Sequence, residues 1–180
     1  MGQYWLIGNI TKKEKIEPMS FRKLMEWCYV GNTMTNKLIN LLQSKWKDDE
    51  IVIVGDYTKR KIDGVNLYTL CEEFKQIDGF IRNPDYRYIY NHKQKKFIDM
   101  LNAIKKSNDE NLIIHPLPLL LAGNENGMGV GDYSKDYFKN TDLVGSWVDD
   151  SSFIEITSER IDDGNYIEFI PNFVERCIKQ

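Results

Sequence analysis

Apolar and polar residues follow strand-like patterns in several parts of the first hundred residues. Residues 3–10 are rich in strand-forming side chains and predict a first, central strand, with residues 15–17 as a short returning partner. The continuous β-branched run 51–54 predicts a strand that is buried on both faces. Residues 86–90 and 96–100 flank a polar stretch and predict a β-hairpin, which places His92 in the turn.

Between these strands, apolar residues recur three and four positions apart, which is typical of helices with one buried face. Ser20 is expected to cap the first helix, and Gly31 is expected to end it. The predicted helices are residues 21–29, 33–46, 66–77 and 101–106.

The second half of the chain is mostly strand-like. The predicted strands are residues 112–114, 143–148, 153–157 and 166–170, the last two joined as a hairpin by the turn 162–165, and residues 173–178 form a short helix or strand. The order strand, helix, helix, strand, helix and then mostly strands predicts an α+β fold. We expect a mixed or mainly antiparallel sheet with two to four helices packed on it, in one domain spanning 1–180.

Composition and charge exclude some classes of function. The chain has 180 residues, 42% of them hydrophobic, and a net charge of −3, which argues against general nucleic-acid binding. No apolar run approaches the length of a membrane span, and the start of the chain lacks a signal-peptide pattern. Three widely spaced cysteines fit a reduced protein, so we expect a cytoplasmic location.

Short basic groups also occur, at residues 12–15, 59–61 and 93–96, each at a predicted turn. Solvated turn lysines are the simplest interpretation of these groups. Any one of them could still serve a small anion.

The most unusual stretch is 112–133, which ends in a loop with four glycines in nine residues: Gly123, Gly127, Gly129 and Gly131. It lacks the Gly-Lys-Ser/Thr of a nucleotide-binding P-loop, and no convincing helix follows the last glycine, as a dinucleotide fingerprint requires. Successive backbone N–H groups without side chains can form a nest that holds an anion. A plain surface loop and a lid that orders on binding remain alternatives.

The tripeptide Gly-Asp-Tyr occurs twice, at 55–57 and 131–133. Each copy offers a carboxylate and an aromatic ring, and together they could flank a heterocyclic base. The predicted ligand-binding residues are therefore Gly123, Asn124, Gly127, Gly129, Gly131, Tyr133, Asp56, Tyr57 and Trp147.

His115 is the histidine with the better prospect of acid–base chemistry, because it follows an apolar run and precedes a proline close to the glycine-rich loop. As an acid or base it would need a carboxylate partner such as Asp132 or Asp56, and His115 with Asp132 is the predicted catalytic pair. A structural role is the alternative for a lone histidine at the end of a strand. The sequence has no Ser-His-Asp or Cys-His spacing and no metal-binding pattern, so we predict no metal and no cofactor.

Several motifs together resemble a family of uncharacterised bacterial proteins, and the resemblance covers most of the chain. These motifs are the Met-Gly-Gln-Tyr start, the helix at 23–27 with Gly31 and Asn32, the segments 54–57 and 115–120, the loop reaching 131–133, and 145–147. The resemblance implies an independent domain. It implies no activity and no catalytic residue.

The first hypothesis is a protein that binds a nucleotide-like, phosphate-bearing small molecule at the loop 123–133, with sequestration of a signalling molecule as one role. A second is a hydrolase or transferase that uses His115 and Asp132. A third is a protein-interaction module or immunity-type inhibitor. The sequence decides neither whether a reaction is catalysed nor the oligomeric state.

Overall fold

The predicted first strand is β1 (Trp5–Asn9), and it lies inside a four-stranded sheet that we call the N-terminal sheet. β1 pairs antiparallel with β3 (Ile51–Gly55) on one side and with β2 (Glu14–Ile16) on the other. β6 (Lys75–Gln76) extends the sheet parallel to β2. Every residue of β1 and β3 is buried, as the apolar run of β3 predicted.

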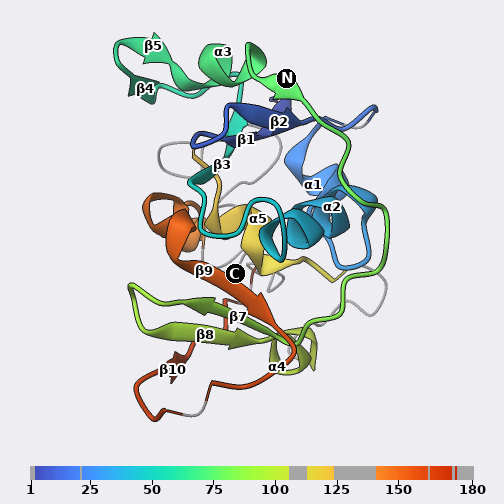
Figure 1. The fold of residues 1–180 in the computed structure, drawn as a ribbon, viewed down its shortest axis with the longest axis vertical. Helices are drawn as coiled ribbons and strands as arrows, with labels where there is room; N and C mark the ends of the chain where they lie inside the picture. The colour runs from blue at the N-terminus through green and yellow to red at the C-terminus, as the bar shows by residue number, and fades with distance from the viewer. Residues whose placement is uncertain are drawn as a thin grey trace, which may run out of the picture.

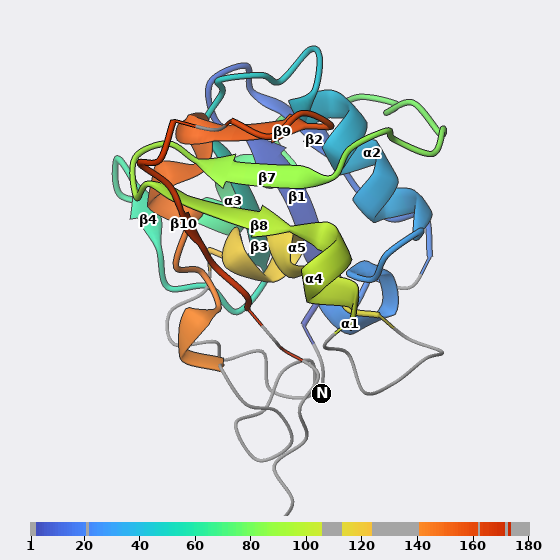
Figure 2. The same cartoon turned by 90° about the horizontal axis from the view of Figure 1, so that it is seen from below.

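The second sheet, which we call the C-terminal sheet, has the strand order β10-β8-β7-β9 (Figure 2). β7 (Tyr88–Asn91) and β8 (Lys96–Asp99) form the predicted hairpin with His92 in its turn. β9 (Ile154–Thr157) pairs antiparallel with β7, and β10 (Ile167–Glu168) pairs parallel with β8. The predicted hairpin between β9 and β10 is therefore wrong, because β10 lies at the opposite edge of the sheet, beside β8, and does not pair with β9.

The computed structural model of the protein describes residues 3–20, 22–105, 113–123, 141–161, 163–171 and 173. In these residues the two sheets lie at opposite ends of the molecule with α1, α2 and α5 between them (Figure 1). The hairpin β4 (Lys61–Ile62) and β5 (Val65–Asn66) and the helix α3 (Leu67–Glu72) lie on the outer side of the N-terminal sheet. The α+β class with mixed and antiparallel sheets is confirmed.

Most predicted helices form, but they are shorter than their apolar patterns. α1 (Leu24–Trp27) begins after Lys23 rather than Ser20, and the Glu26 carboxylate accepts the Lys23 backbone N–H at 3.0 Å. α2 (Thr33–Leu42) is capped by Asn32, whose side chain accepts the Met34 N–H. α3 is capped by Asn66 and ends at Glu72, and the next residues enter β6. α4 (Met100–Lys105) follows β8 directly, as predicted.

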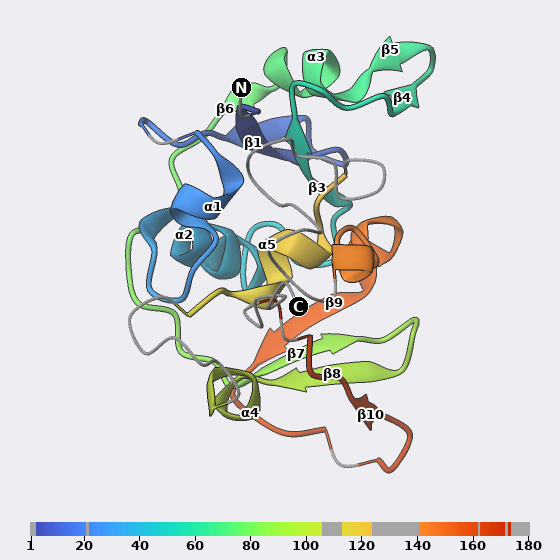
Figure 3. The same ribbon diagram turned by 180° about the vertical axis from the view of Figure 1, so that it is seen from behind.

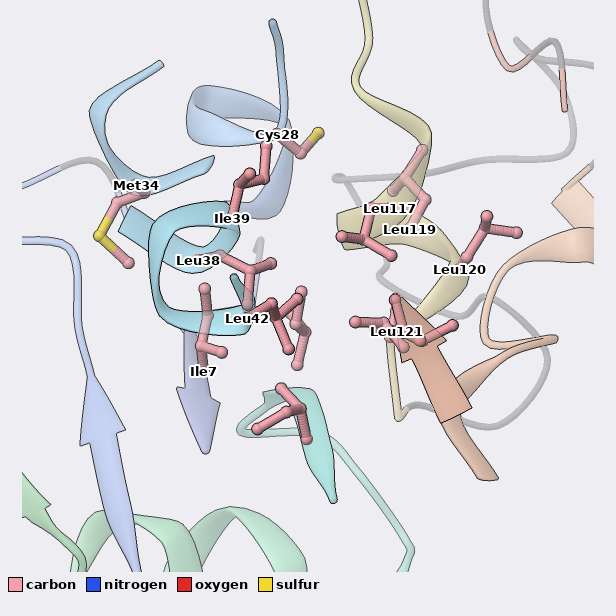
Figure 4. Packing of buried hydrophobic residues seen from close by; sticks show 14 of the residues in the cluster. Ile7, Cys28, Met34, Leu38, Ile39, Leu42, Leu117, Leu119, Leu120 and Leu121 are labelled. Atoms are coloured by element: carbon pink, nitrogen blue, oxygen red, sulfur yellow. The ribbon is translucent and has the colours of Figure 1, made fainter. Parts of the chain in front are cut away.

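The helices between the sheets supply most of the main core. Figure 4 shows side chains of α2, among them Leu38 and Leu42, facing Leu117, Leu119 and Leu121 of the α5 region. Ile7 of β1 extends this cluster into the N-terminal sheet. Isoleucines of the C-terminal sheet close its other end: Ile89, Ile98, Ile154 and Ile156.

The stretch around His115 differs from its predicted strand. Within it, Ile114 makes one isolated antiparallel bridge, to Tyr29, and residues Pro116–Leu120 form the helix α5 (Figure 3). A proline in the first turn of a helix removes no internal hydrogen bond, since the first N–H groups have no partner within the helix. Pro116 and Pro118 therefore start this helix rather than prevent it.

The strand predicted at 143–148 is also wrong. Two 3-10 helices, Thr141–Leu143 and Val148–Phe153, are joined there by a turn in which Gly145 has a φ of 78°. The N–H groups of Gly145 and Trp147 donate to the carbonyls of Leu119 and Leu120 at 2.8 and 2.9 Å. These donors complete the C-terminal end of α5, so they are not free to form a strand ladder. Of the terminal element predicted at 173–178, only Phe173 is described, and it is buried.

Among the described residues, no helix is both long and apolar enough to cross a membrane.

Candidate functional site

His115 is the N-cap of α5 and has no solvent-exposed surface. Its Nδ1 accepts the backbone N–H of Leu117 at 3.2 Å, and its Nε2 lies 2.7 Å from the hydroxyl of Tyr86. Because Nδ1 accepts, the neutral ring carries its proton on Nε2 and donates it to Tyr86. Both ring nitrogens are thus bonded within the protein.

Burial also decides the protonation state of this pair. It lowers the pKa of His115 to about 3, because an imidazolium there would have no water around it. The same desolvation raises the pKa of Tyr86. His115 is therefore neutral at ordinary pH and serves as a helix cap. Asp132 lies outside the described residues, so the predicted acid–base pair stays a prediction.

The first Gly-Asp-Tyr tripeptide lies where β3 ends. Asp56 donates its N–H to the Tyr4 carbonyl, and one carboxylate oxygen of Asp56 accepts the Tyr4 N–H, both at 3.1 Å. Gly55 has no room for a side chain, since a Cβ there would meet the Trp5 ring at 3.0 Å. Tyr57 is half exposed. The turn thus presents a carboxylate and a ring at the carboxyl end of β3.

Gly123, the first glycine of the loop, lies against the same strand. Its N–H donates to the Ile53 carbonyl at 2.6 Å, and Ala122 forms a parallel bridge with Ile53. A Cβ on Gly123 would lie 2.5 Å from Val52 Cγ2 and 3.7 Å from a methyl group of Leu67. Its carbonyl accepts the Thr58 hydroxyl at 3.4 Å. The glycine-rich loop therefore begins beside the turn 55–58.

Val52 and Leu67 also form part of the wall of a hollow of about 240 Å³ on the outer side of the N-terminal sheet. The hollow contains two cations, Arg60 and Lys61, and two carboxylates, Glu50 and Asp149, over an apolar floor; the remaining lining residues are Ile10, Ile51, Ile62 and Val148. The sequence had marked 59–61 only as one of three basic groups. No sequence signal linked Arg60 to Asp149, which lies 89 residues away.

Arg60 is held in a defined position in this hollow. Its two terminal nitrogens lie 3.1 and 3.2 Å from the two carboxylate oxygens of Asp149. The backbone N–H of Arg60 donates to the Thr58 hydroxyl at 3.2 Å, and the Arg60 backbone carbonyl accepts the Leu67 N–H at 2.9 Å. Thr58 thus contacts both Arg60 and Gly123. The guanidinium and the start of the glycine-rich loop belong to one local structure.

Trp147 lies away from solvent. Its ring is fully buried in the main core and packs on Phe169 with the ring centroids 5.7 Å apart. Its indole N–H has no hydrogen-bond partner among the residues that the structure describes. Trp147 holds the end of α5, from which the chain continues to Gly123.

The remaining predicted site residues lie outside the described ranges: Asn124, Gly127, Gly129, Gly131 and Tyr133. Of the predicted residues that are described, Asp56 and Tyr57 follow the carboxyl end of β3 and Gly123 is bonded to Ile53 in the middle of the same strand, whereas His115 and Trp147 are buried in the core. In the described ranges, no three His, Cys, Asp or Glu side chains are grouped as a metal site requires.

The chain matches no protein-family model, and no curated protein and no solved structure matches it.

Proposed function

We propose that this protein binds a small anionic, nucleotide-like ligand in the hollow beside β3, next to Gly123, the first residue of the glycine-rich loop. One observation carries the proposal: Gly123 packs on Val52 and Leu67, which are walls of the hollow that also contains Arg60 and Lys61. Ligands of sheets with helical layers commonly bind at strand ends, where loops and backbone N–H groups converge.

Arg60 is the residue that we assign to the phosphate. A guanidinium matches a phosphate with two parallel hydrogen bonds, as it now matches the carboxylate of Asp149. The Asp149 side chain is 78% exposed, and pairs of this kind contribute only about 0–1 kcal/mol. A phosphate can therefore replace Asp149 at little cost. The phosphate must displace the Asp149 carboxylate from Arg60 rather than bind beside it. The two cations and two carboxylates of the hollow already balance in charge, so an additional anion would leave a net negative charge there.

The rest of the ligand is assigned to the turn 55–58. The ring of Tyr57 is exposed enough to stack on a heterocyclic base, and the carboxylate of Asp56 has acceptor capacity beyond its bond to Tyr4, which suits a sugar hydroxyl or a base amine. This side of the site is not suited to phosphate. Burial is the main cause that raises the pKa of Tyr68 to about 12, and the negative charges of Glu72 and Asp56 contribute to the same shift, so two carboxylates lie near this side.

The test uses inorganic phosphate, pyrophosphate, AMP and ATP as probes, with binding measured by calorimetry and by thermal shift. A ligand present at a hundred times its Kd stabilises the folded state by about 2.7 kcal/mol. Arg60→Gln should abolish binding, whereas Asp149→Asn should tighten it, because the guanidinium is then no longer paired with a carboxylate. These opposite effects distinguish a phosphate site from a structural ion pair.

Arg22→Gln is the matched control, because Arg22 is also a partly exposed arginine paired with a carboxylate, that of Glu17. It should leave binding unchanged. The proposal is abandoned if none of the four probes binds and native mass spectrometry of the purified protein finds no small molecule. It is equally abandoned if Asp149→Asn and Arg60→Gln weaken binding alike.

A further inference from the structure

A second group of polar side chains lies on the C-terminal sheet, far from β3 in the fold. His92 connects two partners: its Nδ1 is 2.6 Å from the Tyr166 hydroxyl, and its Nε2 is 2.7 Å from a carboxylate oxygen of Glu155. The side chains of His92 and Glu155 are about one-third exposed, at 32% and 37%, and Tyr166 is partly exposed. The sequence had indicated only that His92 is a turn residue.

The proton positions in this group follow from its geometry. A carboxylate can only accept, so Nε2 of His92 carries a proton and donates it to Glu155. In the neutral ring Nδ1 is then the acceptor, and the Tyr166 hydroxyl donates to it. Tyrosine, imidazole and carboxylate thus stand in the order of nucleophile, base and orienting group that activated nucleophiles require.

The group is held rigidly by its surroundings. The His92 ring stacks on the Tyr90 ring at an interplanar angle of 8°. The Tyr166 ring packs edge-on against the Tyr90 ring, with the ring centroids 5.1 Å apart. Ile161 packs on the same face of the sheet as Tyr90 and Tyr166, and its backbone N–H donates to the Tyr90 hydroxyl at 2.8 Å. These contacts fix the Tyr166 hydroxyl against His92.

Positive charge lies close to the tyrosine. The Lys95 ammonium is 5.0 Å from the centroid of the Tyr166 ring. Arg160 lies over Phe97 on the same face, at 5.5 Å from its centroid. A cation beside the ring stabilises negative charge that develops on the tyrosine oxygen, and it also attracts an anionic substrate.

We propose that Tyr166, His92 and Glu155 form a site for nucleophilic chemistry, with activated phosphoryl or sulfonyl esters that carry a negative charge as substrates. The Tyr166 oxygen forms a bond to the electrophilic phosphorus or sulfur, and the bond to the leaving group breaks, so that the leaving group departs with the electron pair. The tyrosine proton passes to Nδ1 of His92. Glu155 stabilises the imidazolium through its bond to Nε2.

The test probe is 4-(fluorosulfonyl)benzoate, from which attack by a tyrosine expels fluoride. Peptide mass spectrometry then gives the labelling rate of each tyrosine. Tyr4 and Tyr57 are the internal controls, because they are 54% and 49% exposed and no histidine contact is found for them in the described residues. Because a positioned base contributes on the order of 10²–10⁴ in rate, Tyr166 should label at least about tenfold faster than either control.

Glu155→Gln separates chemistry from structure. Glutamine can still accept the Nε2–H bond but carries no charge, so the fold should be kept while labelling of Tyr166 falls toward the rate of Tyr57. His92→Gly should lose the fast labelling, and added imidazole should restore it, which a merely structural role would not allow. Tyr166→Phe should give no label at this position.

The charge of the probe tests the substrate class. The anionic benzoate should react faster at Tyr166 than the neutral 4-(fluorosulfonyl)benzamide, and Lys95→Gln should remove that preference. Equal rates for the two probes would overturn the anionic class. Labelling of Tyr166 no faster than that of Tyr4 and Tyr57, or an unchanged rate in Glu155→Gln, would overturn the site itself.

Discussion

We expect the free energy of unfolding of this protein to depend on pH through His115, and a single substitution at His115 should remove that contribution. The folded protein holds the ring neutral, with a pKa of about 3, whereas in the unfolded chain the pKa is the ordinary 6.5. Between these values the unfolded chain binds a proton that the folded protein does not bind. The free energy of unfolding therefore falls as the pH falls through this window.

The magnitude follows from the two pKa values. At pH 4.5 the unfolded chain is almost fully protonated at His115 and the folded protein is not, so lowering the pH from 6.5 to 4.5 should remove about 2 kcal/mol of stability through this residue. Such a loss is a large part of the 5–15 kcal/mol that is usual for a domain of ordinary size. Urea unfolding followed by tryptophan fluorescence at the two pH values measures it.

His115→Asn is the informative variant. Asparagine keeps an N-cap acceptor for the Leu117 N–H but cannot take a proton. The variant should be less stable than the natural protein at pH 6.5, because the Tyr86 hydroxyl loses its partner, but its free energy of unfolding should fall about 2 kcal/mol less on going to pH 4.5. Tyr86→Phe should keep the natural pH dependence, because it retains His115.

Carboxylates with lowered pKa values, namely Glu14, Asp99, Asp150 and Asp163, also destabilise the fold in acid, but they are present in all three proteins. The difference between the natural protein and His115→Asn therefore reports His115 alone. If the two proteins lost equal stability between pH 6.5 and 4.5, the ring would have to be protonated in the folded state. The burial argument would then be refuted.

Three further substitutions test the packing around the candidate site and α2. Gly123→Ala should cost about 1–3 kcal/mol of stability, because the new Cβ would lie 2.5 Å from a methyl group of Val52. In a Val52→Ala background this cost should be smaller, and a double-mutant cycle of urea unfolding measures the difference. Additive effects of the two substitutions would contradict the contact. Asn66→Ala should cost at least about 1 kcal/mol in urea unfolding through loss of the α3 cap, and Asn66→Asp should restore only part of it, because Asp keeps the cap acceptor but cannot donate to the Thr58 carbonyl as the Asn66 amide does. Asn40→Ala should cost about 2–3 kcal/mol, because the Asn40 amide donates to the carbonyls of Phe80 and Arg82 and accepts from the Arg82 side chain. If backbone hydrogen exchange in residues 80–82 were the same in the variant and the natural protein, Asn40 would not hold this segment.

The strands that the sequence predicted correctly are those whose evidence is local. The β-branched run of β3 and the alternation in β9 each require a buried or half-buried strand whatever surrounds them. The residues at 162–165 also predict a turn from local sequence alone. A turn indicates that the chain changes direction, but it does not determine which strand the following residues pair with. β10 pairs with β8, and Ile161 and Arg160 before it contact Tyr90 and Phe97, which are about 70 and 60 residues away in the sequence.

The helix α5 was not predicted, because a histidine and two prolines followed by leucines do not show the pattern of apolar and polar residues that marks a helix. Proline is excluded from helix interiors but is favourable in the first turn, and His115 supplies the cap that begins that turn. Whether a histidine is a cap in the core or a base in a cleft is decided by its burial. The partners of His115 include the Tyr86 hydroxyl and the Cys28 carbonyl, which lie 29 and 87 residues away, so the local sequence does not show that the ring is buried.

The candidate ligand site was predicted in part. The glycine density indicated Gly123 and the Gly-Asp-Tyr repeat indicated Asp56 and Tyr57; Gly123 is bonded to β3 at Ile53, and Asp56 and Tyr57 follow the end of that strand. Arg60 could not be assigned, because a basic residue in a turn is usually solvated. Its distinction comes from Asp149 and Thr58, and only the folded chain brings all three together beside Gly123.

The position of Glu155 beside His92 depends on the register with which β9 pairs with β7, and the burial of the β9 isoleucines determines that register. β9 buries Ile154 and Ile156 in the main core, so Glu155 must point to the opposite face, where it lies beside Tyr90. A slip of one residue would place both isoleucines in solvent and the carboxylate in the core, at a cost of several kcal/mol. The packing of the core therefore also brings Glu155 within reach of His92. A hydrogen bond set in this way is present before any substrate binds, which is the condition for an orienting group in catalysis.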